Sequence, residues 1–201
     1  MSLYQVGKRI IDLLAASAGL VLTAPVMLVV AAVIKLESRG PVLFHHVRLG
    51  KDGRPFVMLK FRSMRQDAAA RQAQLVSENE IPGPVFKIRS DPRVTAVGRF
   101  IRKSSLDELP QLWNVLRGEM SLVGPRPPIP DEVARYHPWQ RERLAVKPGL
   151  TCTWQVSGRS DVPFDDWVQM DIEYVRTRSL LMDLKLLLLT VPAVISARGA
   201  Y

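Results

Sequence analysis

"LLAASAGLVLTAPVMLVVAAVI", residues 13–34, decides the fold class, because it runs for 22 positions without a charged side chain. An apolar segment of about 18 residues or more is long enough to be considered a membrane helix. A cleaved signal peptide is the competing interpretation, but its apolar region is shorter, at about 7–15 residues. We therefore expect the segment to be retained and to anchor the chain to a membrane.

The residues around and within this segment leave its path through the membrane open. Lys8 and Arg9 precede it, and Lys35 and Arg39 follow it, so the positive-inside rule gives no direction. Pro25 lies almost at its midpoint, where it removes a helical hydrogen bond. One alternative is a kinked helix that spans the bilayer. The other is a re-entrant hairpin that enters and leaves through the same face. Composition alone favours spanning.

Size, composition and net charge limit the kinds of molecule that the chain is expected to bind. Its 201 residues suit one domain plus an anchor, and 28 Lys and Arg against 19 Asp and Glu give a net charge of +9. Phosphates, anionic lipids and nucleic acid are the natural partners of such a chain. No nucleic-acid motif appears, however, and we expect no nucleic-acid partner. The single Cys152 excludes an intramolecular disulfide, and His45, His46 and His137 lack the spacing of a helical zinc site.

The rest of the chain predicts an α+β fold, mostly helical with a short β-hairpin. Two apolar-rich runs flank Gly50–Gly53, which is typical of a hairpin turn. Alternating bulk bounded by glycines predicts a strand at Leu150–Val156. Residues 164–177 form an amphipathic helical pattern. Residues 180–197 are apolar but too short and too charged to span a bilayer, so we expect an amphipathic helix at the membrane interface or in the core.

An acid pair lies at the centre of "RKSSLDELPQLWNVLRGEMSLVGPRPP", residues 102–128. Asp107 as the N-cap of a helix would put Pro110 at the third helical position, where its missing N–H costs nothing. Ser105 to Glu108 also matches a capping box, although Pro110 argues against that register. On local pattern alone, an ordinary helix cap is the favoured interpretation of Asp107.

The same acid pair is suited to phosphate chemistry. An aspartate among basic residues is expected to stay ionised, and an ionised carboxylate can attack phosphorus or bind Mg²⁺. Arginines near the pair would offset the charge of a pyrophosphate. The sequence has neither the glycine-rich phosphate loop nor the dinucleotide fingerprint, so any phosphate chemistry uses another scaffold.

The longer motifs resemble those of the monotopic phosphoglycosyl transferases, a family of bacterial sugar transferases. The resemblance covers nearly the whole chain, and its central block is highly specific in spacing. It rests on "KRIIDLLAA…P", "SRGPVLFHHVRLGKDGRPFVMLKFRSM", "DPRVTAVGRFIRKSSLDELPQLWNVLRGEMSLVGPRP", "KPGLTCTWQVSGR" and the terminal "GAY". It implies a re-entrant helix–break–helix anchor over residues 1–37, with the break at Pro25, and a catalytic domain over residues 38–201. Ala24 stands where a serine often precedes that proline.

The resemblance also implies a reaction. A sugar-1-phosphate passes from a UDP-sugar to polyprenyl (undecaprenyl) phosphate and UMP is released, as the first membrane step of bacterial glycan assembly. The resemblance also implies that the reaction takes place at the cytoplasmic face of the inner membrane and uses Mg²⁺. Asp107 is implied to be the nucleophile that forms an aspartyl-phosphosugar and also contacts Mg²⁺. Glu108 is implied to be its catalytic partner, as a base or as an organiser of the site.

The remaining implied site residues are basic or polar. Phosphate binding is assigned to Lys60, Arg102 and Arg126, less strongly to Arg62 and Arg99, and nucleotide-sugar binding to Gln155 and Arg159. "TCTWQVSGR" and "GAY" favour a hexose, glucose or galactose. Three alternatives stay open: a direct single-step transfer, a non-catalytic membrane-anchored basic binding protein, and a scaffold. A homo-oligomer is compatible with all of them.

Overall fold

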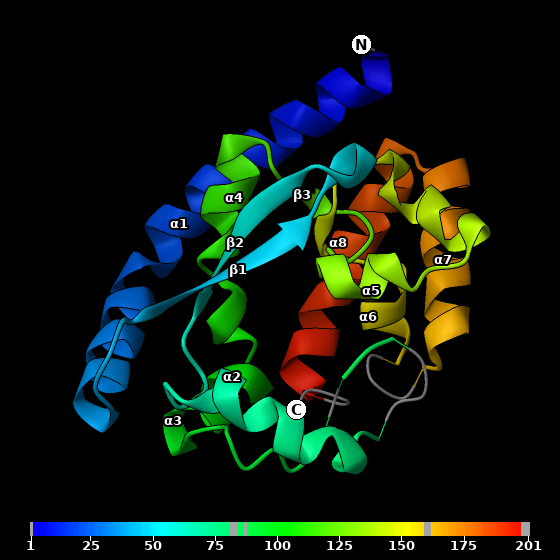
Figure 1. Cartoon of the computed structure of the whole chain (residues 1–201). Helices are drawn as coiled ribbons and strands as arrows, with labels where there is room; N and C mark the ends of the chain where they lie inside the picture. Colours follow the sequence, from blue (N-terminus) through cyan, green and yellow to red (C-terminus); the bar gives the residue numbers. More distant parts are fainter. Residues whose placement is uncertain (1, 81–83, 87, 159–161, 198–201) are drawn as a thin grey trace.

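The computed structural model describes residues 2–80, 84–86, 88–158 and 162–197, in which helices surround two small sheets (Figure 1). This confirms the mostly helical α+β architecture expected from the sequence. The helices are α1 (Leu3–Glu37), α2 (Ala68–Arg71), α3 (Ala96–Lys103), α4 (Gln111–Arg117), α5 (Pro130–Ala134), α6 (Thr153–Ser157), α7 (Phe164–Thr177) and α8 (Leu180–Ser196). Shorter 3₁₀ segments are η1 (Lys51–Gly53), η2 (Gln72–Glu78), η3 (Leu106–Glu108) and η4 (Pro138–Ala145).

The predicted hairpin is confirmed. Strands β1 (Leu43–Leu49) and β2 (Pro55–Phe61) pair antiparallel, with Leu43 opposite Phe61. The turn between them contains Asp52 at φ 57° and Gly53 at φ 73°, left-handed conformations that aspartate tolerates and glycine favours. The hairpin brings the end of β2 toward the segment that precedes α4.

The second sheet differs from the expectation at Leu150–Val156. Strand β4 (Gly149–Thr151) is only three residues long, and the chain turns into α6 at Thr153. The reason is its partner: β4 pairs in parallel with β3 (Ser121–Val123), which is equally short. Residues beyond Thr151 therefore have no neighbouring strand among the described residues, and a helix satisfies their backbone groups instead.

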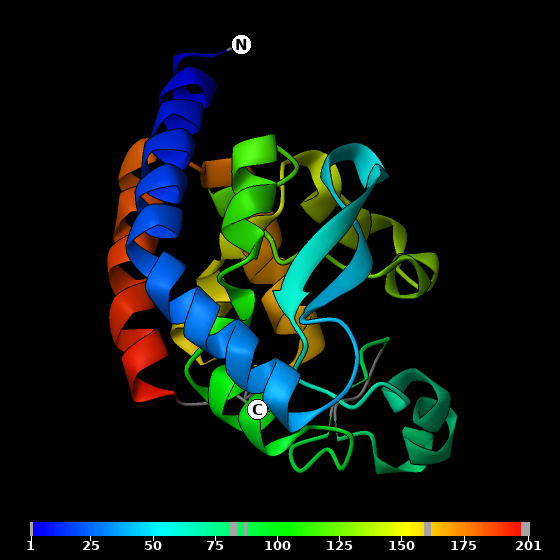
Figure 2. The same cartoon turned by 90° about the vertical axis from the view of Figure 1, so that its left-hand side faces the viewer.

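Helix α1 is unbroken through Pro25. Figure 2 shows that it bends part-way along its length, so the helix break expected at Pro25 is not observed and the helix is only bent. Pro25 removes one backbone donor, and Thr23 donates its hydroxyl to the Gly19 carbonyl at 2.7 Å, a contact that commonly bends helices. Both halves of α1 pack on the rest of the chain. Ala16 joins the central core, and Ile34 packs in a cluster with Phe61.

Helices α1 and α8 lie side by side (Figure 2), and both carry exposed apolar side chains. Helix α1 is long and apolar enough to cross a membrane, and only 11% of its apolar window is buried. The expected helix over residues 180–197 is confirmed as α8, and its acid, Asp183, is buried rather than on the outer face. This apolar surface is consistent with membrane association. It includes Leu14, Val21, Leu22, Leu28 and Val29 of α1 and Leu181, Leu188, Val191 and Ile195 of α8.

Candidate active site

The acid pair does not cap α4. Asp107 and Glu108 lie in the separate 3₁₀ turn η3, which the chain enters through Ser105 at φ 57°. Helix α4 begins only at Gln111, and Pro110 occupies its cap position without a side-chain hydrogen bond. The prediction that Asp107 is the N-cap is therefore wrong, because Leu109 N–H already bonds to Leu106 O and closes a tighter turn before Pro110.

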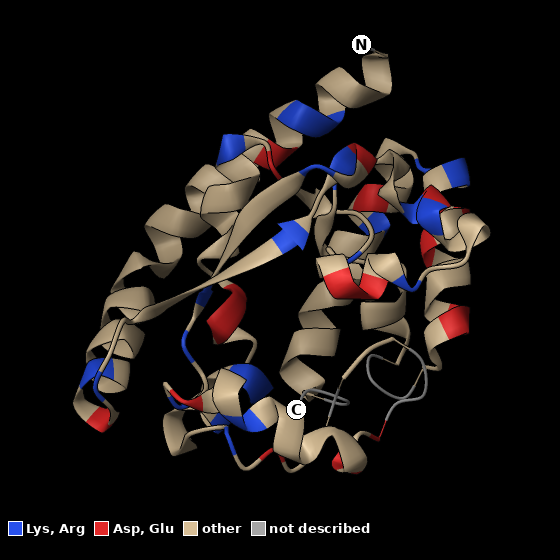
Figure 3. Cartoon of the chain, in the orientation of Figure 1, with Lys and Arg blue, Asp and Glu red and all other residues tan. Residues whose placement is uncertain are grey.

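The two carboxylates have very different partners. Glu108 Oε1 accepts hydrogen bonds from Lys60 Nζ at 2.8 Å and from Arg126 Nη2 at 3.1 Å. Asp107, only 7% exposed, accepts no side-chain hydrogen bond from the described residues, and its ion pair with Lys60 is long, at 3.8 Å. Figure 3 shows the acidic turn before α4 beside the basic end of β2. The site therefore contains one carboxylate bound by two cations through a single oxygen, and one without a hydrogen-bonding partner among the described residues.

The electrostatics follow from this division. Burial raises the pKa of Glu108, but Lys60 and Arg126 outweigh it and hold that pKa well below its usual range. Burial and the charge of Glu108 raise the pKa of Asp107, although Lys60 and Arg102 oppose the shift. The basic surroundings were expected to favour the ionised form of Asp107. The direction is reversed because burial is the largest influence on this pKa, and the like charge of Glu108 adds to it.

A buried amide fixes the distance between Lys60 and the acid pair. Asn114 of α4 is fully buried, accepts a hydrogen bond from Leu59 N–H at 3.0 Å and donates to Val57 O at 2.7 Å. It thus pairs with β2 much as a neighbouring strand would. Lys60 is the next residue of β2, and the acid pair lies one turn before α4, so this contact positions both sides of the site.

Arg102 reaches the site from α3. Its Nε donates to Ser63 Oγ at 2.9 Å, and its charge acts on Asp107. Helix α3 begins after Thr95, whose hydroxyl accepts from Gly98 N–H at 2.9 Å. A Cβ at Gly98 would lie 1.9 Å from the Ser63 carbonyl oxygen, so glycine permits the close approach that brings Arg102 to the pair. Arg99, on the same helix, is exposed.

Arg62 lies away from the acid pair. Its guanidinium donates to the Ser38 carbonyl at 2.8 Å and to the Ser38 hydroxyl at 3.0 Å, at the end of α1. Two-residue alternation would place Arg62 on the same face as Lys60. Strand β2, however, ends at Phe61, so the alternation no longer applies and Arg62 caps a helix end instead.

A family model described as "bacterial sugar transferase" matches residues 3–197. The chain belongs to this family. It is 43% identical over 196 residues to the galactosyl transferase CpsE of Streptococcus agalactiae, covering 97% of this chain and 43% of that protein. It is 43% identical over 198 residues to the exopolysaccharide production protein ExoY of Rhizobium meliloti, covering 96% of this chain and 88% of that protein.

A third relative is named for a specific reaction. The undecaprenyl-phosphate galactose phosphotransferase of Salmonella typhimurium is 42% identical over 198 residues, covering 96% of this chain and 41% of that protein. The chain thus spans less than half of two of these relatives and most of ExoY. The family resemblance inferred from the motifs is confirmed.

The two residues expected to bind a nucleotide sugar are only partly described. Gln155 lies on α6, where its Oε1 accepts a hydrogen bond from the Cys152 thiol at 3.0 Å. Cys152, which immediately precedes α6, is near enough to Arg126 to influence its pKa. Arg159 lies outside the described residues.

Sequence reasoning missed two residues of β1. Arg48 donates to Pro127 O at 2.9 Å and contacts His46 Nδ1 at 3.2 Å. Burial, with the positive charges of Arg48, Lys60 and Arg126, lowers the pKa of His46 to about 4. Their spacing could have indicated this, because residues two apart in a predicted strand lie on the same face of it.

The donor set suits a weakly held hard cation. Among the described residues there is no group of three or more His, Cys, Asp or Glu side chains that could hold a metal. Mg²⁺ commonly binds one or two carboxylates together with substrate phosphate. Asp107, whose oxygens make no hydrogen bond to the described residues, fits that role, and Glu108 is already engaged by Lys60 and Arg126.

Proposed function

We propose that this chain transfers a sugar-1-phosphate from a UDP-sugar to polyprenyl phosphate and releases UMP. The observation that carries the proposal is the asymmetry of the acid pair: Asp107 has no hydrogen-bond partner among the described residues, while Glu108 binds Lys60 and Arg126. A carboxylate that is not consumed by capping or by a short ion pair is free to attack an electrophile. Relatives named for galactosyl or galactose phosphate transfer support a hexose as the sugar.

The proposed reaction has two steps. A carboxylate oxygen of Asp107 attacks the phosphorus that bears the sugar, and the bond from that phosphorus to the oxygen bridging to UMP breaks. UMP leaves with the electron pair. An oxygen of polyprenyl phosphate then attacks the same phosphorus, the bond to Asp107 breaks, and the free carboxylate is restored.

The cations around the pair are assigned to the phosphates. Lys60 and Arg126 are held by Glu108 and offer their remaining N–H groups to phosphate oxygens. Arg102, oriented by Ser63, adds a third positive charge close enough to act on Asp107. Mg²⁺ at Asp107 would neutralise phosphate charge and favour the ionised carboxylate. In this arrangement Glu108 organises the site rather than attacking the phosphorus.

The location of the site is proposed to be the cytoplasmic face of the inner membrane. The exposed apolar surface of α1 and α8 supports an anchor over residues 1–37 that enters and leaves through one face, followed by a catalytic domain over residues 38–201. Cysteines placed at Ser2 and Ser38 should then react with an impermeant reagent from the same side. Labelling from opposite sides would show a spanning helix.

The first test is UMP release from a panel of UDP-sugars in detergent with Mg²⁺ and undecaprenyl phosphate. Release that depends on lipid, on metal and on Asp107 supports the proposal and names the sugar. Labelled UMP should also exchange into the UDP-sugar without lipid, and Asp107→Asn should abolish this exchange. Exchange that persists in folded Asp107→Asn protein would instead favour the direct single-step transfer. Folded wild-type protein that releases no UMP from any sugar would contradict the proposal.

A further inference from the structure

The segment that carries Arg126 is held by its backbone carbonyls. Pro125 O accepts a hydrogen bond from Gly149 N–H at 2.9 Å, and Pro128 O accepts one from Leu49 N–H at 2.9 Å. The donors come from β4 and β1, which lie far apart in the sequence. One end of this short segment is therefore attached to the β3–β4 sheet and the other end to the β1–β2 sheet.

Two arginines hold the two carbonyls between these ends. Arg143 Nη2 donates to Arg126 O at 3.0 Å, and Arg48 Nη1 donates to Pro127 O at 2.9 Å. Four consecutive carbonyls thus each accept a hydrogen bond from another part of the chain. Because proline restricts φ as well, the backbone beneath the Arg126 side chain has little freedom to move.

Arg143 is itself deeply buried. Its side chain is 3% exposed and that of its ion-pair partner Asp171, on α7, is 1% exposed, with 2.5 Å between Arg143 Nη2 and Asp171 Oδ2. Arg143 Nη1 also donates to the Tyr136 hydroxyl at 2.7 Å. One guanidinium nitrogen therefore connects the buried carboxylate of α7 to the backbone carbonyl of Arg126.

Stability alone is a weak reason for this buried pair. Removing two charges from water is costly, and apolar replacements of similar size are often neutral or stabilising. Arg143 Nε and Asp171 Oδ1 are buried without a hydrogen-bond partner among the described residues, so the pair is incompletely satisfied. What an apolar pair would lack is the hydrogen bond to Arg126 O.

We propose that Arg143, oriented by Asp171, is a positioning residue that fixes the Arg126 backbone so that the Arg126 guanidinium meets Glu108 and the substrate phosphate. The part of this inference that concerns substrate rests on the proposed function. The part that concerns the backbone does not, because it depends only on the contacts of the Pro125–Pro128 segment.

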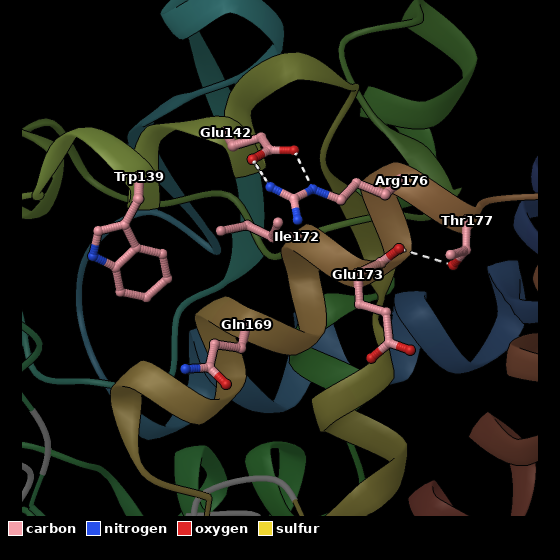
Figure 4. A pocket seen from close by; sticks show the side chains of 7 residues that line it. All are labelled: Trp139, Glu142, Gln169, Ile172, Glu173, Arg176 and Thr177. Atoms are coloured by element: carbon pink, nitrogen blue, oxygen red, sulfur yellow. Dashed lines mark hydrogen bonds and ion pairs between the residues drawn. The ribbon is translucent and has the colours of Figure 1, made fainter.

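The fold provides a matched control. Glu142 and Arg176 form a second ion pair between the same elements, η4 and α7, with contacts of 2.7 and 2.6 Å (Figure 4). This pair is exposed, at 36% and 67%, and lines an open pocket of about 370 Å³ beside Trp139. Among the described residues, neither side chain of this pair bonds to Arg126, so its loss perturbs the η4–α7 junction without touching the segment.

The experiment compares Arg143→Met/Asp171→Leu with Glu142→Gln/Arg176→Gln in the full chain. Amide hydrogen exchange is measured at Leu49 and Gly149, whose N–H groups bond to the same segment. We expect exchange at both amides to be at least about tenfold faster in the first variant and unchanged in the second. Arg143→Lys, which keeps a cation beside Asp171 but loses the forked geometry, serves if the apolar pair does not fold.

Turnover supplies the second measurement. We expect kcat for UMP release to fall at least about tenfold in the Arg143→Met/Asp171→Leu variant. In an Arg126→Lys background the same pair of changes should have little further effect, since coupled residues are not additive. An equal loss in both backgrounds, or wild-type exchange and wild-type kcat in the folded variant, would overturn the inference. A wild type without turnover would count against the proposed function alone, because the exchange result still decides whether Arg143 holds the segment.

Discussion

Two buried clusters of charge show opposite degrees of satisfaction. At the N-terminal end of α1, Asp183 Oδ1 accepts from the Tyr174 hydroxyl at 2.6 Å, and Oδ2 accepts from Lys8 at 2.9 Å and from the Tyr4 hydroxyl at 3.1 Å. At the acidic turn, Asp107 has only a 3.8 Å ion pair with Lys60 among the described residues. One cluster uses both carboxylate oxygens, and the other leaves a carboxylate without hydrogen bonds.

The difference separates a structural role from a chemical one. Burying a carboxylate is costly unless hydrogen bonds replace the lost water, so a fully satisfied acid such as Asp183 stabilises the attachment of α1 to α8. An incompletely satisfied acid such as Asp107 retains unused acceptor capacity, which a phosphorus centre or a metal can take up. Substitutions in the two clusters should therefore affect different properties.

The largest expected effect is at Asp107. Asp107→Asn keeps the volume and removes the nucleophile, so kcat should fall by at least about a thousandfold. The melting temperature should stay near that of the wild type, because the side chain makes no hydrogen bond to the described residues. Asp131→Asn, at an exposed acid, is the control. If Asp107→Asn loses both activity and much of its stability, Asp107 would have a structural role.

The next effect in size is at Asp183, and it concerns stability. Asp183→Asn leaves Lys8 without its carboxylate in a largely buried site, which should cost about 3 kcal/mol of unfolding free energy. The folded fraction should retain a kcat near that of the wild type. Denaturation in detergent and UMP release per folded molecule measure the two quantities. If Asp183→Asn keeps wild-type stability but loses turnover, the Asp183 cluster would have a role in the reaction and not a structural one.

A third, intermediate effect is expected at Glu108, which has both a structural role and a role in the reaction. Glu108→Gln weakens the hold on Lys60 and Arg126, so kcat should fall by about a hundredfold, or about 2.7 kcal/mol in barrier. Some stability should be lost too, because two cations then share a neutral partner. If Glu108→Gln matches Asp107→Asn in kcat and leaves stability unchanged, Glu108 acts in the chemistry itself.

The smallest effect concerns the pH dependence of stability at His46. Its pKa is lowered to about 4 in the folded protein, so the unfolded chain takes up a proton first as the pH falls below the ordinary value of 6.5. This residue therefore costs stability progressively between pH 6.5 and pH 4 and costs none above that window. His46→Gln should show a smaller drop in melting temperature from pH 7.5 to pH 5 than the wild type does. An identical drop would mean that His46 does not titrate as its surroundings indicate.

The success of sequence reasoning differed between local and non-local features. The hairpin at Gly50–Gly53 and the helix over residues 164–177 are confirmed, because their turn residues and periodicity are local signals. The strand expected at Leu150–Val156 is mostly wrong, because its length depends on a partner strand elsewhere in the chain. The prediction of Asp107 as a helix cap is wrong because Leu106–Glu108 form a separate 3₁₀ turn before α4 begins at Gln111.

The candidate site shows the same limit. Lys60 and Arg126 were predicted beside the pair, and the structure brings both to Glu108. Arg62, two residues from Lys60, is instead bound to the end of α1. Nothing in the local sequence distinguishes Arg62 from Lys60 or Arg126. Whether a side chain binds the acid pair or a helix end depends on where β2 ends and on which backbone carbonyls are left unpaired nearby.

The sequence by itself determined the apolar N-terminal helix, the hairpin, the amphipathic helices and the presence of an acid pair among basic residues. Each follows from side-chain periodicity, turn chemistry or charge within a short window. Only the tertiary structure decided that Glu108 binds the cations while Asp107 has no hydrogen bond from the described part of the chain, and that Arg143 holds the backbone of Arg126. These outcomes depend on contacts between segments far apart in the chain, where packing and burial set both the distances and the pKa values.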